Sequence, residues 1–400
     1  MFYPFLKISC RILFRLLYHK MHVNGKQLQR LEGPTLIVAN HPNSLLDALL
    51  IGTYCNKPIH FIVRSDMFNK PFIRTLLKWL NGIPVYRIAE EKHRLRENLK
   101  SFEYCKKVLQ QNGVILFFGE GKTVHDWKLK PMRSGLTRLL DIAMEDVQLR
   151  KQLQIIPAAV NYSKYQCLLK AIHIDVGPAL QNWQPNDEEP YAAWKKRFHQ
   201  QMFDAISMHK YQMHSDNTTA RMWWETCFNS CGQICTTPSA RAQFLHRIGK
   251  QIERSDFNAP APKSQYAYPF YPLTRIALLQ NQLLLALLAI PTLVSLLLNG
   301  IPYLCIRWFC KKFLKETIFY DSVLTVAVML LMPLWWMKLF TISYLMHEPL
   351  LYWMAPAAII SGYLSLHGWK VFYTVWNYMK SNAAFRTECK TLLQLSNSER

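Results

Sequence analysis

The sequence predicts an α/β domain with a mixed, largely parallel sheet flanked by helices, followed by a helical region and a C-terminal transmembrane helical segment. Three observations support this order. Short apolar runs alternate with helical patterns from about residue 30 to 180, which is typical of α/β layers. A more polar helical pattern follows to about residue 270, and three long apolar blocks come after it.

The first segment, residues 1–22, is predicted to be an amphipathic basic helix at a membrane interface. In "MFYPFLKISCRILFRLLYHK", Lys7, Arg11, Arg15 and His19 follow one another at steps of four. This spacing places the basic groups on one helix face, near lipid phosphates, with bulky apolar residues around the rest. Two alternatives stay open: a cleavable leader, or a helix that docks on the protein's own domain.

Residues 23–182 form the predicted α/β domain. The buried strands are read from "PTLIVAN", "PIHFIVR", "GVILFFG" and "LQIIPAAV", and "GIPVYR" is a shorter strand. The helices are read from "SLLDALLIG", "PFIRTLLKWL", "EKHRLRENLKSFEYCKKVLQQ" and "MRSGLTRLLDIAMED". Residues 183–272 are predicted to be a helical extension that ends in a Pro/Tyr-rich linker, "APAPKSQYAYPFYP".

Residues 273–372 are predicted to be membrane-embedded helices, and 373–400 a polar tail. Ile276–Ile306 carries no charge, and crossing a bilayer core takes about 20 apolar residues. Pro291, Pro302 and the Asn-Gly pair between them allow a bent span or a re-entrant pair. Further apolar blocks run over Val323–Met346 and Pro349–Trp369, with tryptophans suited to interfacial belts. Three such blocks in succession favour a membrane over a buried soluble bundle.

The charge balance restricts the partners. There are 48 Lys and Arg against 26 Asp and Glu, a net charge of +22, which attracts nucleic acid, anionic lipid or phosphorylated substrates. No nucleic-acid-binding module is recognisable, and the apolar blocks favour lipid. The ten cysteines form no compact disulfide framework, so we expect reduced thiols and a cytoplasmic catalytic part. Cys227, Cys231 and Cys235, at steps of four, indicate helix packing rather than a metal site.

Chemistry is first indicated by "VANHPNSLLDALLIG", Val38–Gly52. Pro42 disfavours a helical conformation at His41, which therefore lies in the turn after a strand. Ser44 fits an N-cap and Asp47 the N3 position, so Asp47 has a structural role as a helix start. Helical side chains lean towards the N-terminus, so the same carboxylate is able to hold one nitrogen of His41. This base-plus-orienter pair activates a hydroxyl. No G-x-S-x-G elbow is present, so that hydroxyl belongs to the substrate.

A second candidate stretch is "LFFGEGKTVHDWKLKPMRSG", Leu116–Gly135, in which an apolar strand ends in Gly-Glu-Gly and several cations follow. Glycines let the backbone approach a ligand, and cations such as Lys122 and Arg133 suit a phosphate. A third stretch delivers Arg87 from the end of "GIPVYR". Neither dinucleotide nor P-loop glycine patterns occur. "IIPAAVNY" reads as a core strand in which Pro157 shapes a pocket wall.

Together these four stretches resemble the glycerophospholipid acyltransferase superfamily, the glycerol-3-phosphate and lysophosphatidate acyltransferases. The matching blocks are Asn40-His41…Asp47, Gly82…Arg87, Phe118-Gly119-Glu120-Gly121 and Ile156-Pro157, within about residues 25–180. Five residues separate the histidine and the aspartate instead of the usual four, and Gly119 replaces the usual proline. These departures resemble a subgroup that includes dual-substrate glycerol-3-phosphate/dihydroxyacetone-phosphate acyltransferases with C-terminal membrane helices.

The resemblance implies a membrane-bound O-acyltransferase of phospholipid biosynthesis. Its donor is an acyl thioester, acyl-CoA or acyl-ACP, and its acceptor is glycerol 3-phosphate, dihydroxyacetone phosphate or 1-acylglycerol 3-phosphate. We expect His41 and Asp47 to be catalytic, with Arg87, Lys122 and Arg133 holding the acceptor phosphate. The resemblance adds Glu120 and Gly121 to the acceptor site.

We expect neither a cofactor nor a metal. The predicted location is the inner or cytoplasmic membrane, with the catalytic domain facing the cytoplasm. Alternatives are a lysophospholipid or lyso-aminolipid acceptor, or a catalytically silent membrane scaffold. The joint presence of His41, Asp47 and Glu120 disfavours the scaffold.

Overall fold

A computed structural model describes residues 2–18, 20–86, 97–168, 170–186, 188–214, 218–235, 237–253, 275–315, 317–347 and 352–380. The chain divides into two compact units. The first comprises residues 1–7, 23–161 and 173–212, and the second residues 8–22, 162–172 and 213–400. The predicted segment boundaries over residues 1–22, 23–182, 183–272, 273–372 and 373–400 stay predictions.

The strands are β1 (Lys20–Asn24), β2 (Thr35–Ala39), β3 (Ile59–Arg64), β4 (Gly82–Val85), β5 (Val114–Phe118), β6 (Gln154–Tyr162) and β7 (Ala171–Val176). The helices are α1 (Phe2–Leu17), α2 (Leu45–Tyr54), α3 (Pro71–Trp79), α4 (Glu97–Gln110), α5 (Gly135–Met144), α6 (Val147–Gln152), α7 (Tyr191–Ser207), α8 (Thr218–Ile234), α9 (Pro238–Ile252), α10 (Arg275–Leu314), α11 (Tyr320–Met346) and α12 (Met354–Lys380). All five strands predicted from apolar runs are present. Strands β1 and β7 and helix α6 were not predicted.

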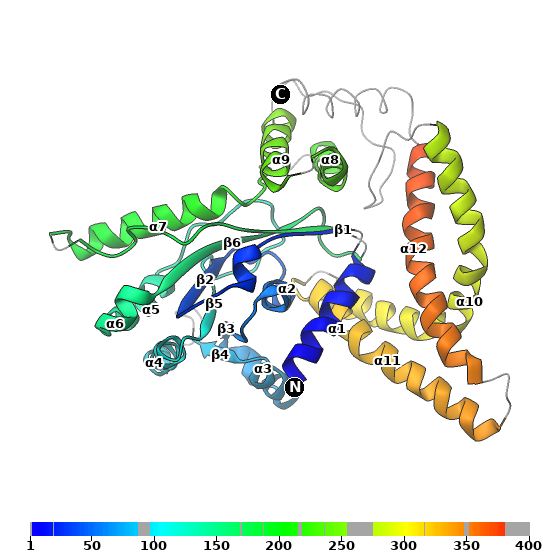
Figure 1. Cartoon of the computed structure of the whole chain (residues 1–400), viewed down its shortest axis with the longest axis horizontal. Helices are drawn as coiled ribbons and strands as arrows, with labels where there is room; N and C mark the ends of the chain where they lie inside the picture. Colours follow the sequence, from blue (N-terminus) through cyan, green and yellow to red (C-terminus); the bar gives the residue numbers. More distant parts are fainter. Residues whose placement is uncertain are drawn as a thin grey trace. The chain divides into compact units, whose positions relative to one another are not determined.

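The strands form one seven-stranded sheet in the order β1-β7-β6-β2-β5-β3-β4. Strand β2 pairs in parallel with both β5 and β6, and β3 pairs in parallel with β4 and β5. The five strands from β6 to β4 therefore run in one direction, as the alternation of strands and helices predicts. The predicted α/β class with a largely parallel sheet is confirmed (Figure 1).

One face of this sheet carries the main core of the first unit. Leu36 of β2 lies beside Ile115 of β5 and Ile155 of β6, so the three side chains share a face. They belong to a buried cluster to which α4, α5 and α7 also contribute. The largest members from α7, Trp194 and Phe198, are fully buried. This burial fixes the strands whose carboxyl ends carry the site.

In the second unit, α1 buries one face and exposes another. Phe14, Leu17 and Tyr18 are buried, and the Tyr18 hydroxyl hydrogen-bonds Thr325 Oγ1 at 2.8 Å. Leu17 packs in a cluster with residues of α10 and α11. Ile8 and Ile12 are more than half exposed. The buried face of α1 thus packs on the protein itself, as one of the alternatives predicted. For the exposed face, a place at a membrane interface remains a prediction.

Two of the three apolar blocks form helices that are long and apolar enough to cross a membrane, by length and composition alone: Ile276–Leu314 and Tyr320–Met346. The first block is one continuous helix, α10, with Pro291 and Pro302 inside it, and it bends visibly in Figure 1. A proline in a helix removes a hydrogen bond and introduces such kinks. The predicted bend is therefore present within one continuous helix, and its crossing of a membrane stays a prediction.

Asn299 links the three apolar helices. Its side-chain amide donates to the carbonyl of Ala358 in α12 at 2.8 Å and accepts from the indole of Trp336 in α11 at 2.9 Å. Buried polar side chains join helices in this way where few other polar partners are available. Helix α12 continues to Lys380, beyond the predicted start of the polar tail. The Pro/Tyr-rich linker lies outside the described residues.

Candidate active site

The turn after β2 brings His41 and Asp47 together. His41 Nδ1 lies 3.0 Å from Asp47 Oδ2, and the histidine side chain is 18% exposed while the carboxylate is fully buried. Asp47 stands in the first turn of α2, so its side chain leans back over the turn that carries His41. The predicted contact is present. It engages Nδ1 and leaves Nε2 as the ring nitrogen available for a reacting group.

Asp47 also anchors the backbone of the same turn. Its Oδ2 accepts the Asn43 N–H at 2.7 Å. Ser44 occupies the predicted N-cap position of α2, but it has φ 54° and its side chain makes no capping hydrogen bond. A left-handed conformation turns the residue away from the geometry in which a serine hydroxyl reaches the N3 amide. Asp47 therefore anchors the start of α2 and also contacts His41, so its structural role is observed and its catalytic role stays a prediction.

Two further contacts fix the imidazole. The side-chain amide of Asn40 donates to the carbonyl of Val160 at 3.0 Å and accepts the N–H of the same residue at 2.7 Å. This pair of bonds ties the end of β2 to β6. On the other side, the His41 ring stacks on Phe118, with centroids 3.8 Å apart. The His41 ring thus rests on the end of β5, and the residue before it, Asn40, is bonded to β6.

The turn after β5 is built around two glycines. Gly119 donates its N–H to the carbonyl of Ala39 at 3.1 Å, and a Cβ at this position would collide with the Met132 sulfur. A proline has no N–H and would meet the same sulfur, so the departure from the family pattern has a physical reason here. Gly121 has φ +63°, and a Cβ on it would lie 3.0 Å from Arg133 Cγ. Arg133 therefore packs directly against this turn.

Glu120, between the glycines, is a buried carboxyl with 5% exposure. Its pKa is raised to about 7, chiefly by burial and to a smaller extent by the nearby carboxylate of Asp47. The charge of Lys210, the backbone N–H of Lys130 and the charge of Lys130 oppose this rise. Glu120 therefore titrates near neutral pH, which is unusual for a carboxyl group and common at functional sites.

The topology explains why these side chains meet. Strand β2 continues through α2 to β3 on one side of the sheet, and β5 continues through α5 and α6 to β6 on the other. Connections that leave two adjacent strands in opposite directions open a crevice beyond their carboxyl ends, where α/β proteins bind ligands. His41 follows β2 and Glu120 follows β5, so both stand at this switch point.

The remaining predicted residues divide into two groups, and two further residues were not predicted. Lys122 and Arg133 are exposed and lie on the loop that begins with Glu120 and Gly121. Arg87 lies outside the described residues, two positions after the end of β4. Sequence analysis missed Lys210 and Asn161, which lie buried near the site. A lysine that follows a helix is expected to be exposed to solvent, so no signal in the sequence indicates that Lys210 is buried.

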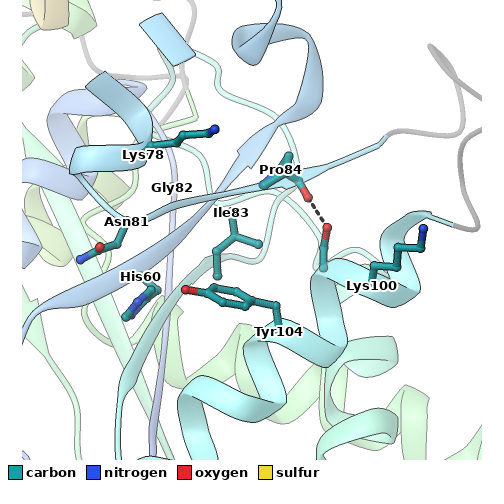
Figure 2. A pocket seen from close by; sticks show the side chains of 9 residues that line it. His60, Lys78, Asn81, Gly82, Ile83, Pro84, Lys100 and Tyr104 are labelled. Atoms are coloured by element: carbon teal, nitrogen blue, oxygen red, sulfur yellow. Dashed lines mark hydrogen bonds between the residues drawn. The ribbon is translucent and has the colours of Figure 1, made fainter. Parts of the chain in front are cut away.

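A separate pocket of about 310 Å³ lies at the edge of the sheet, between α3, β4 and α4 (Figure 2). It includes His60 and Gly82, near the amino ends of β3 and β4, whereas His41 and Glu120 follow the carboxyl ends of β2 and β5. Of the predicted site residues that the structure describes, none lines it. Its lysines, Lys78 and Lys100, come from α3 and α4 (Figure 2). This pocket is distinct from the candidate active site.

Comparison with known families decides the class of the domain. Residues 20–161 match the family model described as Acyltransferase. This part of the chain is an acyltransferase domain. For these residues the prediction of an acyltransferase domain, and with it of an enzyme that transfers acyl groups, is confirmed. The matched segment contains the whole His41–Asp47 turn and the Glu120 turn of the acyltransferase domain.

Among solved structures, the chain is similar to the crystal structure of the 1-acyl-sn-glycerophosphate (LPA) acyltransferase PlsC from Thermotoga maritima. The identity is 14%, the TM-score is 0.38, and the match covers 53% of this chain and 81% of the other. No curated protein matches the sequence. The acyltransferase assignment therefore comes from the family match, and the site from the geometry above.

Proposed function

We propose that this acyltransferase moves a fatty acyl group from an acyl thioester to the hydroxyl of a glycerol-phosphate-type acceptor in phospholipid synthesis. The observation that carries the proposal is the 3.0 Å contact between His41 Nδ1 and Asp47 Oδ2 at the carboxyl end of β2. Oriented in this way, the imidazole presents Nε2 as a general base. Such assistance accelerates a reaction by about 10²–10⁴-fold.

The mechanism uses one proton and one leaving group. His41 Nε2 takes the proton of the acceptor hydroxyl as its oxygen attacks the thioester carbonyl. The tetrahedral intermediate collapses, the C–S bond breaks, and the imidazolium returns the proton to the thiolate. The buried carboxylate of Asp47 stabilises the imidazolium in between. The products are an ester and a free thiol, and no metal or cofactor takes part.

The acceptor phosphate is proposed to bind on the loop that follows Glu120. Lys122 and Arg133 provide exposed cations beside the Glu120 turn, and Arg133 packs on Gly121. Arg87 is the third proposed cation. Holding the phosphate at this point converts binding energy into alignment of the hydroxyl with His41. Glu120 and Gly121 shape the space between the two groups.

Membrane attachment is proposed through α10 and α11, with α12 packed beside them. The cations Arg307, Lys311, Lys312 and Lys315 lie at or just beyond the end of α10. Positively charged residues of this kind stay on the cytoplasmic side of bilayers. We therefore place this end, and the catalytic domain, in the cytoplasm. The basic surface suits anionic donors and acceptors.

The test is acylation by the purified full chain in detergent. A labelled acyl-CoA or acyl-ACP is offered with glycerol 3-phosphate, dihydroxyacetone phosphate, lysophosphatidate or a lyso-aminolipid. We expect transfer to one of the first three acceptors. Preference for a lysophospholipid without a terminal phosphate, or for the lyso-aminolipid, would replace the proposed acceptor. Absence of transfer to every acceptor would support a silent scaffold.

The phosphate site has its own test in Arg133→Glu. Charge reversal should raise the KM for a phosphate acceptor at least about tenfold, since a charge-assisted bond becomes a repulsion. The KM for the acyl thioester should change less. Arg138→Glu, an exposed arginine of α5, is the matched control. An unchanged acceptor KM in Arg133→Glu would remove Arg133 from the site.

A further inference from the structure

Lys210 is a buried cation that the mechanism above does not use. It follows α7 and is 1% exposed. Within the described part of the chain, its Nζ has no hydrogen-bond partner. Burying an ammonium group without a hydrogen-bond partner destabilises the folded state, and nearby carboxylates offset part of that free-energy cost.

The backbone around Lys210 is fastened to the end of β6. The side-chain amide of Asn161 donates to the carbonyl of His209 at 2.9 Å, and its oxygen accepts the N–H of Tyr211 at 2.9 Å. The bonds flank Lys210 on both sides, and its own N–H donates to the carbonyl of Ile206 at 2.8 Å. Its position is thus set by β6, the strand next to β2.

The loop after β5 is joined to the same segment. Gln212 accepts the N–H of Leu129 through its side-chain oxygen at 3.1 Å, and its amide donates to the hydroxyl of Ser207 at 2.8 Å. Segment 209–212 therefore lies between β6 and the loop that starts at Glu120. This location is beside the predicted acceptor site.

Three carboxylates act on Lys210: Glu120, Asp47 and Asp126, in order of decreasing effect. Burial nevertheless lowers the pKa of Lys210 to about 8. Asp126 has its own ion pair with Lys130 and also accepts the N–H of Lys128. Asp126 therefore already has a cationic partner. Lys210 is the buried cation that compensates the charges of Glu120 and Asp47.

Other titratable groups pack around the same segment. The hydroxyl of Tyr211 donates to Asp175 at 2.6 Å, and its ring contacts His173 edge-on. Burial lowers the pKa of the neighbouring His209, which disfavours its charged form. These groups lie on β7 and beside Lys210.

We propose that Lys210 is a positioning residue for acyl transfer: its buried ammonium stabilises the negative charges of Asp47 and Glu120 next to His41. The inference rests on the proposed function, because it assigns Lys210 to the same site. Lys210 touches neither substrate. It acts through Asp47, which orients the base, and through Glu120, which shapes the acceptor site.

The first experiment compares Lys210→Met with the wild type across pH, in the full chain in detergent. Methionine keeps the apolar stem and removes the charge. At pH 7, kcat/KM should fall about fivefold, since a rise of one unit in the pKa of Glu120, from about 7, lowers its ionised fraction from about one half to about one tenth. At pH 9 the loss should shrink below about threefold. Wild-type Lys210, with a pKa of about 8, has then largely lost its own proton.

Two controls separate this role from packing. Lys106→Met removes a surface lysine paired with Glu145 at 2.7 Å and should leave the pH profile unchanged. Lys210→Arg should restore activity at pH 7 and keep it at pH 9, because arginine holds its proton. If Lys210→Met does not fold, as judged by its unfolding temperature, Lys210→Arg against the wild type carries the test. An equal loss at pH 7 and pH 9 would mean a structural role only.

The coupling to Glu120 gives a second readout. In a Glu120→Gln background, adding Lys210→Met should lower kcat/KM less than about threefold, because the two residues act as one unit.

A third readout needs no substrate. The carboxyl carbon resonance of Glu120 should titrate near pH 7, and its pKa should rise by about one unit in Lys210→Met. An unmoved titration would overturn the inference. A wild type that transfers no acyl group would instead overturn the proposed function.

Discussion

At the scale of single residues, Asp47 performs two tasks with one oxygen. Its Oδ2 accepts hydrogen bonds from both the imidazole of His41 and the N–H of Asn43. Asp47→Asn keeps an oxygen for the backbone bond and loses the charge that stabilises the imidazolium. We expect kcat to fall at least about 100-fold. The unfolding temperature should change by a few degrees at most. Steady-state kinetics and thermal unfolding check this, and acylation at the wild-type rate would leave Asp47 with a purely structural role.

Glu120 predicts a pH dependence of acceptor binding. Because burial raises its pKa to about 7, the carboxyl is mostly ionised at pH 8 and mostly protonated at pH 6. The ionised form is the one that accepts a hydrogen bond from an acceptor hydroxyl. The acceptor KM should therefore rise about tenfold from pH 8 to pH 6. In Glu120→Gln the KM should be high and flat over that range. A KM that depends equally on pH in both proteins would exclude Glu120 as the source.

At the scale of elements, the ends of three strands are tied to one another. Asn40 bonds both backbone groups of Val160, and each bond is buried. Asn40→Ala leaves a buried N–H and a buried carbonyl without this partner, which costs about 2–3 kcal/mol. We expect that loss of stability in urea unfolding and a fall in kcat as His41 becomes misaligned. Asn69→Ala, at an exposed asparagine, is the control. Equal stability of the two variants would contradict the role of Asn40.

The elements also show which features a sequence pattern captures. β2 and β5 are uninterrupted apolar runs because they are buried on both faces, so their ends and the motifs after them were predictable. β7, "AIHIDV", is as buried but carries His173 and Asp175, whose partners come from a distant segment. No local pattern announces such partners. Lys210 was not predicted for the same reason, because the carboxylates near it follow β2 and β5 and lie far from it in the sequence.

At the scale of the whole molecule, the residues proposed for catalysis belong to one unit and the apolar helices to the other. The chain passes from the first unit to the second and back between β6 and β7, through residues 162–172. This short passage is fixed inside the second unit by Lys170, which forms an ion pair with Asp321 of α11. The backbone N–H of Gln166 donates to the same carboxylate at 2.9 Å. The passage is therefore anchored to the start of a candidate membrane helix.

This anchor gives the last prediction. Lys170 and Asp321 are at most 1% exposed, and Lys170 lies over the ring of Tyr162 at 4.8 Å. Removing one partner of a buried pair leaves the other charge uncompensated, so Lys170→Met should destabilise the protein by about 3–5 kcal/mol in detergent. The double variant Lys170→Met/Asp321→Asn should recover a large part of that loss. Lys164→Met breaks a partly exposed pair with Glu225 and should cost less than about 1 kcal/mol. Equal costs for Lys170→Met and Lys164→Met would show that the buried pair does not anchor the passage.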